Sequence, residues 1–376
     1  MKRLNMKVWW VGLLCLLSAS AWAEPGGIAS RAWVLIDQAS GHELAAHQAD
    51  LPLAPASLTQ LMTAYVLLGD IHKNKLSLGE TVTVPEAATQ ADGARIFLKA
   101  GDKVSIDTLL QAMLVQSASD ATLTLVMTAS GSEAAFVERM NREARRLGMS
   151  KTHFMNATGL TEPGHASSAR DLALLGRALV RDFPDRLGFF SQKELAIKGL
   201  THYNDNRLLW RDSTVAGLKV GRTVQAGYCM VASAKRGGQR RIAVVLGARS
   251  DAQRTQEGLK LLNYGFENFD SVKLYRAQQP VKTVDLYRGA RSTVSMGFMQ
   301  DFYLLVPRGA SSRVKAEVIT RRPVVAPVSR GSRMGTLRLT LDGKLLGDYP
   351  LVALHDVSVA GILGRGWDSI RLFFAR

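Results

Sequence analysis

Three short segments of this chain carry residue types that could perform acyl transfer. Ser57-Leu58-Thr59-Gln60 comes first, Ser117-Ala118-Ser119-Asp120 follows 60 residues later, and Lys219-Val220-Gly221 lies a further 102 residues on. Acyl transfer needs a nucleophile, a base that takes its proton, and donors for the developing oxyanion. A serine can be the nucleophile, and a lysine whose pKa is lowered by burial can end a proton route from Ser57 through Ser117 to Lys219. Each segment alone also fits a structural role, since a serine at a helix start is commonly an N-cap.

The first segment opens a predicted helix. Leu58, Leu61, Met62, Tyr65 and Val66 recur at helical spacing after Pro55. Ser57 is therefore expected at the helix N-terminus, where the dipole favours an alkoxide. Gln60 lies three residues on, on the same face and within reach of Ser57 Oγ. A carboxamide has no useful basicity, so Gln60 can hydrogen-bond Ser57 but cannot act as its general base.

Other chemistries are disfavoured by the motifs. His42-Glu43 is followed by His47, but this second histidine is five residues after the first and so falls off the face that an HExxH zinc site requires. The chain has no GxGxxG or Walker loop and no GxSxG elbow. We therefore expect neither a metal nor another cofactor.

Composition and charge limit the possible partners. The chain has 376 residues, a length typical of two domains, and its 47% hydrophobic content excludes a disordered chain. Its net charge of +16 predicts affinity for nucleic acid, an anionic membrane surface or an anionic polymer. Two cysteines provide neither a disulfide framework nor a cysteine zinc site.

The first residues resemble a secretory signal peptide. Lys2, Arg3 and Lys7 precede an apolar run over residues 8–17, and Ala21-Trp22-Ala23 gives a cleavage pattern. A membrane anchor is the alternative, but this run is too short to span a bilayer comfortably. We therefore expect residues 1–23 to be removed and the chain to be exported. Export disfavours nucleic acid and leaves the membrane or a cell-wall polymer.

Periodicity predicts an α+β domain over residues 24–275. The expected strands are 31–37, 41–47, 227–234 and 241–247. The expected helices are one that begins at Ser57 and three at 106–113, 121–129 and 133–147. Arg139, Arg142, Arg145 and Arg146 supply much of the polar surface of the fourth helix. A basic turn over residues 235–238 joins the last two strands.

Beyond residue 279 the pattern changes. Short β-branched segments at 281–286, 293–296, 302–306, 314–319 and 334–341 predict a small all-β domain over 280–356. Residues 357–376 return to a helical period, with Trp and Phe on one face and Arg opposite. Such a helix either lies in the surface of an anionic membrane or packs on the β domain.

Together, the three segments resemble the SxxK, SxN and KTG motifs of the low-molecular-mass penicillin-binding proteins that are D-alanyl-D-alanine carboxypeptidases. The flanking residues are similar too: Pro55-Ala56, Phe154-Met155-Asn156, Gly164-His165-Ala166-Ser167-Ser168-Ala169, Asn206-Arg207-Leu208-Leu209, Gly217-Leu218 and Ala226-Gly227-Tyr228. The resemblance implies a transpeptidase-like domain, with an antiparallel sheet and helices on both sides, followed by a small β domain. It implies peptidoglycan stem peptides as substrate, β-lactams as covalent inhibitors, and a periplasmic location on the outer face of the inner membrane, where the terminal helix meets anionic lipid.

The resemblance also assigns roles to residues. Ser57 is the expected nucleophile, Ser117 a proton relay, and Lys219 and Gly221 bind the substrate, while the backbone N–H groups of Ser57 and Arg222 form the oxyanion hole. Three positions depart from the motifs: Gln60 replaces the lysine, Ser119 the asparagine and Val220 the threonine.

Three functions remain open from the sequence. The chain is a serine D,D-carboxypeptidase working slowly through a substitute base, a non-catalytic relative that binds stem peptide or a wall-synthesis partner, or a membrane-attached structural protein.

Overall fold

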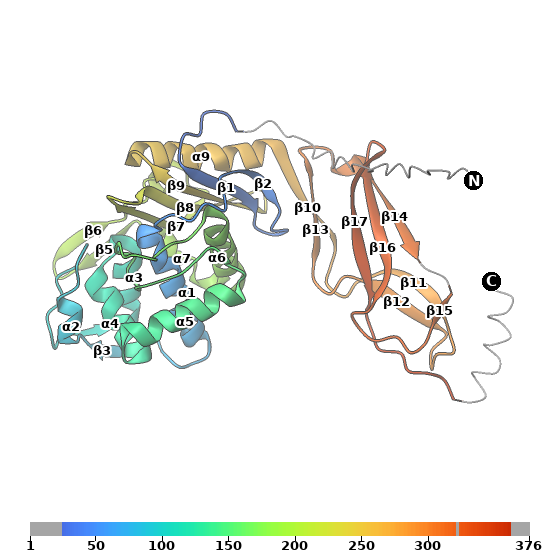
Figure 1. Ribbon diagram of the computed structural model, residues 1–376, viewed down its shortest axis with the longest axis horizontal. Coiled ribbons are helices and arrows are strands. Elements are labelled where there is room, and N and C mark those ends of the chain that lie inside the picture. Colours follow the sequence, from blue (N-terminus) through green and yellow to red (C-terminus); the bar gives the residue numbers. More distant parts are fainter. Residues whose placement is uncertain (1–24, 321–322, 362–376) are drawn as a thin grey trace, which may run out of the picture.

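The computed structural model describes residues 25–320 and 323–361. Within them an α+β domain is followed by a separate β domain, as the sequence predicts (Figure 1). The predicted signal peptide and most of the predicted terminal helix lie outside the described residues.

A five-stranded antiparallel sheet forms the centre of the first domain. Its order is β2-β1-β9-β8-β7, with β1 at Ala32–Asp37, β2 at Glu43–His47, β7 at Val215–Thr223, β8 at Gly227–Arg236 and β9 at Gln239–Ala248. Successive side chains of a strand point to opposite faces. Val34 and Val244 accordingly belong to one apolar cluster and Leu35 and Val245 to another.

Helices cover both faces of this sheet, which confirms the expected architecture (Figure 1). On one face lie α1 (Gln60–His72) and α6 (Ala169–Asp182), and on the other lies α9 (Asp251–Asn268). Serine side chains cap α6 and α9, since Ser168 accepts from Asp171 N and Ser250 from Gln253 N.

The remaining elements of this domain are short or lie beyond these helices. They are η1 (Ala56–Thr59), β3 (Thr81–Thr83), α2 (Glu86–Thr89), β4 (Lys103–Ser105), α3 (Ile106–Gln116), α4 (Ser119–Ser130), α5 (Glu133–Arg146), η2 (Pro184–Arg186), α7 (Gly188–Ser191), β5 (Glu194–Ile197), β6 (Leu200–Tyr203) and α8 (Leu208–Arg211).

The second domain is built almost entirely from strands. It contains β10 (Phe269–Tyr275), β11 (Pro280–Tyr287), β12 (Thr293–Gly297), β13 (Phe302–Pro307), η3 (Ser311–Arg313), β14 (Val314–Thr320), β15 (Val324–Val325), β16 (Arg333–Leu341) and β17 (Lys344–Ala353). Strands β10 and β13 pair with each other, while β14-β16-β17-β12-β11-β15 form a six-stranded sheet. The expected boundary after residue 275 is displaced, because β10 pairs with a strand of this second domain.

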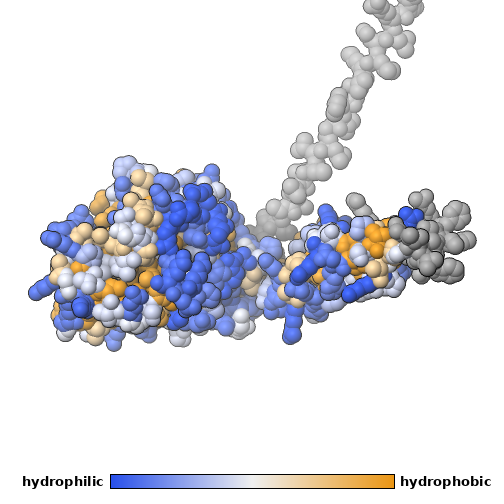
Figure 2. Space-filling view, turned by 90° about the horizontal axis from the view of Figure 1, so that it is seen from below, coloured by the Kyte–Doolittle hydropathy of each residue, from blue (hydrophilic) through white to orange (hydrophobic). Residues whose placement is uncertain are grey.

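The start of the predicted terminal helix is wrong. Residues 357–361 are extended, Val357 forms a β-bridge with Val328, and Val359 forms one with Gly289. Val357 is buried in the apolar core of this domain, so packing overrides the helical period at this point. The domain exposes Ile319, Val325 and Val359. Figure 2 shows an apolar patch on one face of this domain.

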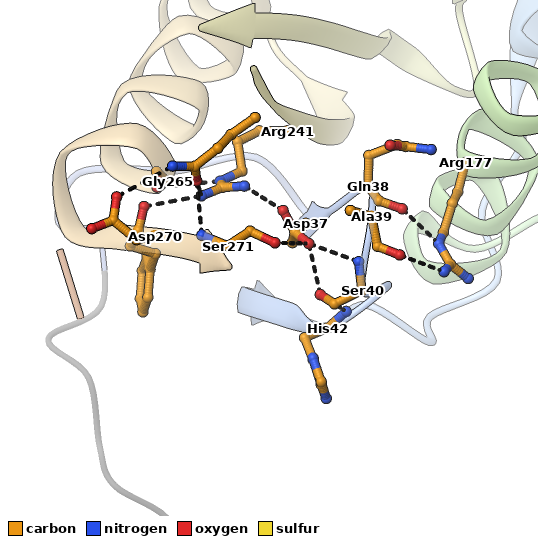
Figure 3. A network of polar contacts seen from close by, with 12 residues as sticks. Asp37, Gln38, Ala39, Ser40, His42, Arg177, Arg241, Gly265, Asp270 and Ser271 are labelled. Carbon is orange, nitrogen blue, oxygen red and sulfur yellow. Dashed lines mark hydrogen bonds and ion pairs between the residues drawn. The ribbon is translucent and has the colours of Figure 1, made fainter. Parts of the chain in front are cut away.

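A buried ion pair marks the junction of the two domains. Arg241 and Asp37 are both fully buried and joined by a hydrogen bond, and Ser271 Oγ of β10 donates to the same carboxylate at 3.0 Å (Figure 3). Arg241 also donates to Phe269 O at 3.0 Å and to Gly265 O at 3.3 Å. The pair therefore joins the central sheet to the chain that leaves α9.

We expect Asp37→Asn to lower the free energy of unfolding by about 3–5 kcal/mol, because it removes the one carboxylate that is hydrogen-bonded to the buried Arg241 guanidinium among the described residues. Urea unfolding followed by circular dichroism measures this. Asp348→Asn is the matched control, because Asp348 pairs with Arg338 on the exposed face of the β domain and its loss should hardly change the unfolding midpoint. Equal effects of the two variants would contradict the assignment of the junction.

Candidate active site

Ser57 lies in a 3₁₀ turn directly before α1. The turn spans Ala56–Thr59, so the helix begins at Gln60 and not at the serine itself. Ala56 has a φ of 49°, in the left-handed region that costs a non-glycine residue about 1 kcal/mol or more. Ser57 is half-buried, whereas Leu58, Thr59 and Gln60 are buried. With this strained first residue of the turn, Ser57 is the one side chain of the segment that lines a cleft.

Two glycines allow the backbone to approach Ser57 closely. A Cβ on Gly221 of β7 would lie 2.7 Å from Ser57 N, and one on Gly159 would lie 2.0 Å from Ala56 O. Gly159 also has a φ of +89°, which disfavours a side chain. Any larger residue at either position would displace the serine, so this part of the site depends on both glycines.

Gln60 occupies the motif lysine's position at the start of α1 and is fully buried. Its Nε2 donates to Ser117 O at 3.2 Å and to Thr122 Oγ1 at 3.3 Å. Its Oε1 is buried without a hydrogen-bond partner in the described part of the chain. The amide is thus fixed against the backbone of the second motif, and it offers an acceptor of no useful basicity.

Ser117 and Lys219 form the polar pair of the site. Ser117 ends α3 in a left-handed conformation with a φ of 58°, and Lys219 Nζ donates to its Oγ at 2.5 Å and to Val220 O at 3.3 Å. Lys219 is 2% exposed. Burial lowers the pKa of Lys219 to about 8, Asp205 partly opposes this, and Arg254 adds to it. A fraction of this amine is therefore neutral near physiological pH and able to accept a proton.

The other two departures from the motifs are both buried. Ser119 begins α4 and is 3% exposed, and its backbone N–H donates to Ala94 O at 2.7 Å. Val220 is also 3% exposed and packs with the apolar cluster beneath α9. Each lines the cleft, but Ser119 brings a short hydroxyl and Val220 only methyl groups.

The structure brings most of the predicted site residues into one cleft of about 400 Å³. Those that line it are Ser57, Ser117, Ser119, Val220, Gly221 and Arg222. Gln60 and Lys219 do not line it and are buried. Ser117 lines the cleft and also contacts both buried residues, which makes it the link between them and the space a substrate would occupy.

The cleft also contains charged residues that the sequence did not indicate. Asp251 of α9 pairs with Arg207 at 2.7 Å and with Arg254 at 2.8 Å, and Arg254 Nη1 donates to Gly221 O at 3.0 Å. The Tyr228 ring lies 5.1 Å from the Arg222 guanidinium and 5.4 Å from that of Arg254. Buried Arg254 thus supports the strand that approaches Ser57. Only the flanking Asn206-Arg207 and Gly227-Tyr228 could have indicated part of this group from the sequence.

In residues 25–320 and 323–361, no group of histidine, cysteine or carboxylate side chains could hold a metal ion. Cys229 is a free, buried thiol. The candidate catalytic groups among the described residues are therefore the serine and lysine side chains, and no metal site is found among these residues.

Comparison with known proteins identifies the relatives of both domains. The family model "D-alanyl-D-alanine carboxypeptidase" matches residues 19–250, and "Penicillin-binding protein 5, C-terminal domain" matches 269–359. D-alanyl-D-alanine carboxypeptidase DacC of Escherichia coli is 37% identical, over 95% of this chain and 91% of that protein. Penicillin-binding protein 5 of Haemophilus influenzae is 34% identical, with a TM-score of 0.86, over 90% of this chain and 100% of the other. Penicillin-binding protein D2 of Listeria monocytogenes, solved in its ampicillin-bound form, is 34% identical with a TM-score of 0.59, over 64% of this chain and 98% of the other.

Proposed function

The chain belongs to the D-alanyl-D-alanine carboxypeptidase family, and we propose that it removes the terminal D-alanine from peptidoglycan stem peptides through a slow Ser57 acyl-enzyme reaction. The observation that carries this proposal is the hydrogen bond from Lys219 Nζ to Ser117 Oγ, behind the cleft that Ser57 lines. Through this hydrogen bond the amine of Lys219 can accept a proton from Ser117, which the amide of Gln60 cannot do.

The proposed proton route runs from Ser57 through Ser117 to neutral Lys219. As Ser57 Oγ forms its bond to the peptide carbonyl carbon, its proton passes to Ser117 Oγ and the proton of Ser117 passes to Lys219 Nζ. The lysine then returns a proton through Ser117 to the departing D-alanine nitrogen, and the C–N bond breaks. Water repeats the sequence on the ester and releases the shortened peptide. Backbone N–H groups of Ser57 and Arg222 hold the oxyanion in each step.

Substrate binding in this proposal uses a cation that lines the cleft. The exposed Arg222 guanidinium meets the terminal carboxylate, because Lys219 is buried and serves as the neutral proton acceptor, and Gly221 leaves room for the peptide beside β7. Val220 gives no hydroxyl to that carboxylate, which weakens binding relative to a threonine. β-Lactams would acylate the same serine.

A non-catalytic role is the second candidate, and the contacts of Gln60 favour it. Its amide is fixed by Ser117 O and Thr122 Oγ1 in the motif lysine's position, so among the residues that the structure describes no base is hydrogen-bonded directly to Ser57. A cleft of unchanged shape would then bind stem peptide without turning it over, or bind a wall-synthesis partner.

Labelled penicillin separates these functions. We expect the wild-type chain to form a covalent adduct slowly, with mass spectrometry placing it on the Ser57 peptide and Ser57→Ala giving none. Titration with a peptide ending in D-Ala-D-Ala then measures binding. Binding without any adduct would establish the non-catalytic role, and absence of both would leave a purely structural protein.

We further propose that the chain is exported and lies on the outer face of the inner membrane, attached by its C-terminal tail to anionic lipid. Among the described residues no helix is long and apolar enough to cross a bilayer. Residues 357–361 belong to the β domain, so only the chain after Gly361 is assigned to the membrane.

A chain truncated after Gly361 should therefore move to the soluble fraction of the cell envelope with an unchanged melting temperature, because the strand bridges at Val357 and Val359 are kept. Fractionation and thermal melting measure the two effects. Continued membrane association, or a large loss of stability, would show that the tail packs on the β domain instead.

A further inference from the structure

A second cavity of the described chain lies away from the catalytic cleft. It is a groove of about 620 Å³ between α1 and α5. We call it the α1–α5 groove; it is lined by Tyr65, Val66, Gly69, Asp70, His72, Lys73, Lys75, Arg139, Arg142, Glu143, Arg146, Asp182 and Phe183. Helix α1 begins behind Ser57 and reaches the groove with its second half, roughly 15 Å further along at 1.5 Å per residue. The catalytic site and the groove are therefore two separate features of one helix.

Every carboxylate that lines the groove is already neutralised by a neighbour. The pairs are Asp70 with Arg139 at 2.5 Å, Glu143 with Arg146 at 2.6 Å, and Asp182 with Arg181 at 2.6 Å and with the Tyr65 hydroxyl at 2.7 Å. Burial and the neighbouring Asp182 raise the pKa of Tyr65 to about 12, so its phenol stays neutral. No acidic group of the groove is therefore left to repel an anion.

Three cations of the groove remain unused. Lys73 and Lys75 are exposed and have no side-chain partner within the part of the chain that the structure describes. Arg142 has only Glu138 at 3.8 Å, an exposed pair of little energetic value. The dipole of α1 accounts for a cation at Lys73, directly after its last turn, but not for Arg142 within α5. Figure 2, which views the molecule from the side where α5 lies in Figure 1, shows both hydrophilic and apolar surface on this domain.

Gly69 keeps the floor of the groove open. A glycine inside a helix costs roughly 1 kcal/mol relative to alanine. Gly69 has neither a positive φ nor a close neighbour, since a Cβ added there would meet no atom within 4 Å. Neither local conformation nor packing therefore requires this glycine, and the absence of a longer side chain here leaves open space above α1.

We propose that the α1–α5 groove binds an acidic peptide segment, whose carboxylates pair with Lys73, Lys75 and Arg142 and whose apolar side chain lies above Gly69. The cations come from two separate elements, so they suit anions spaced along a chain more than one compact phosphate. The groove is also lined by Val66 and the Phe183 ring, which meets Tyr65 edge-on with ring centroids 5.3 Å apart. A peptide in which acidic residues flank one apolar residue matches both surfaces.

Fluorescence anisotropy with labelled Ac-Glu-Glu-Leu-Glu-Glu-amide and the full chain tests this. We expect saturable binding that weakens about tenfold in the double variant Lys75→Gln with Arg142→Gln, and similarly in Gly69→Gln, which fills the floor. Gly69→Ala and Arg145→Gln are the matched controls, because alanine keeps the space and Arg145 is exposed on α5 outside the groove. Both controls should bind like wild type, and melting temperatures verify that every variant is folded.

Three results would overturn the proposal. One is the absence of saturable binding up to roughly 1 mM peptide, a very weak affinity. The second is equal weakening by Arg145→Gln, which would reveal general attraction to a basic protein. The third is that tripolyphosphate, and a peptide with glycine in place of leucine, each bind as tightly as the leucine peptide. That result would show that the groove binds anions without regard to an apolar side chain.

Discussion

Replacing Gln60 with lysine is expected to raise the rate at which penicillin acylates Ser57 by about 10²-fold, because a positioned general base contributes 10²–10⁴-fold to such a step. The 3₁₀ turn, the following helix and the close approach of Gly221 to Ser57 N are all present, so the main missing part is the proton acceptor. Burial and the positive charge of Lys219 would lower the pKa of a lysine at position 60 toward the neutral form. Stopped-flow acylation with a fluorescent penicillin gives the rate.

Gln60→Met is the control for this experiment. It has a similar length and no basicity, so acylation should stay at or below the wild-type rate. Restoring asparagine at Ser119 and threonine at Val220 should help only once the lysine is present, because effects within one catalytic unit are not additive. If wild type already acylates as fast as the triple variant, the proton takes another route and our account of Gln60 is wrong.

The sequence predicted the elements that have a regular apolar pattern, either a helical repeat or a continuous apolar run. The hairpin of β8 and β9 is an example, since its strands are apolar nearly throughout and a Gly-containing turn joins them. Helix α9 was missed because its buried side includes Arg254 and Glu257, which are 4% and 5% exposed and interrupt the apolar pattern. The helical period of residues 357–376 predicts a helix from residue 357, but the bridge between Val357 and Val328 keeps the start of this segment in the β domain.

The candidate site shows the same division. Ser57, Ser117 and Lys219 were recognised by their order and spacing, and the structure places Ser57 and Ser117 on one cleft with Lys219 hydrogen-bonded to Ser117. Asp251 and Arg254 were not predicted from the sequence. The hydrogen bond from Arg254 to Gly221 O joins a helix to a strand 33 residues away, and no local sequence pattern specifies such a contact. The burial that lowers the pKa of Lys219 is likewise a property of the folded core.

Acylation of wild-type Ser57 should increase with pH and level off above about 8. The acceptor in the proposed route is the neutral amine of Lys219, and burial lowers the pKa of that amine to about 8 from the value of 10.5 typical of lysine. Below pH 8 most of the amine is protonated and cannot take the Ser57 proton, so the rate falls about tenfold for each pH unit. Rates measured between pH 6 and 9.5 should therefore follow a single titration.

Two variants connect this profile to the lysine itself. Lys219→Met removes the acceptor and should reduce acylation by at least about 10²-fold at every pH. Asp205→Asn removes a carboxylate that raises the pKa of Lys219, so the midpoint should move to lower pH while the plateau is retained. Melting temperatures of both variants verify folding. A rate that does not change with pH, or a midpoint unmoved by Asp205→Asn, would exclude Lys219 as the base and leave Ser57 without an activating group, as the non-catalytic role requires.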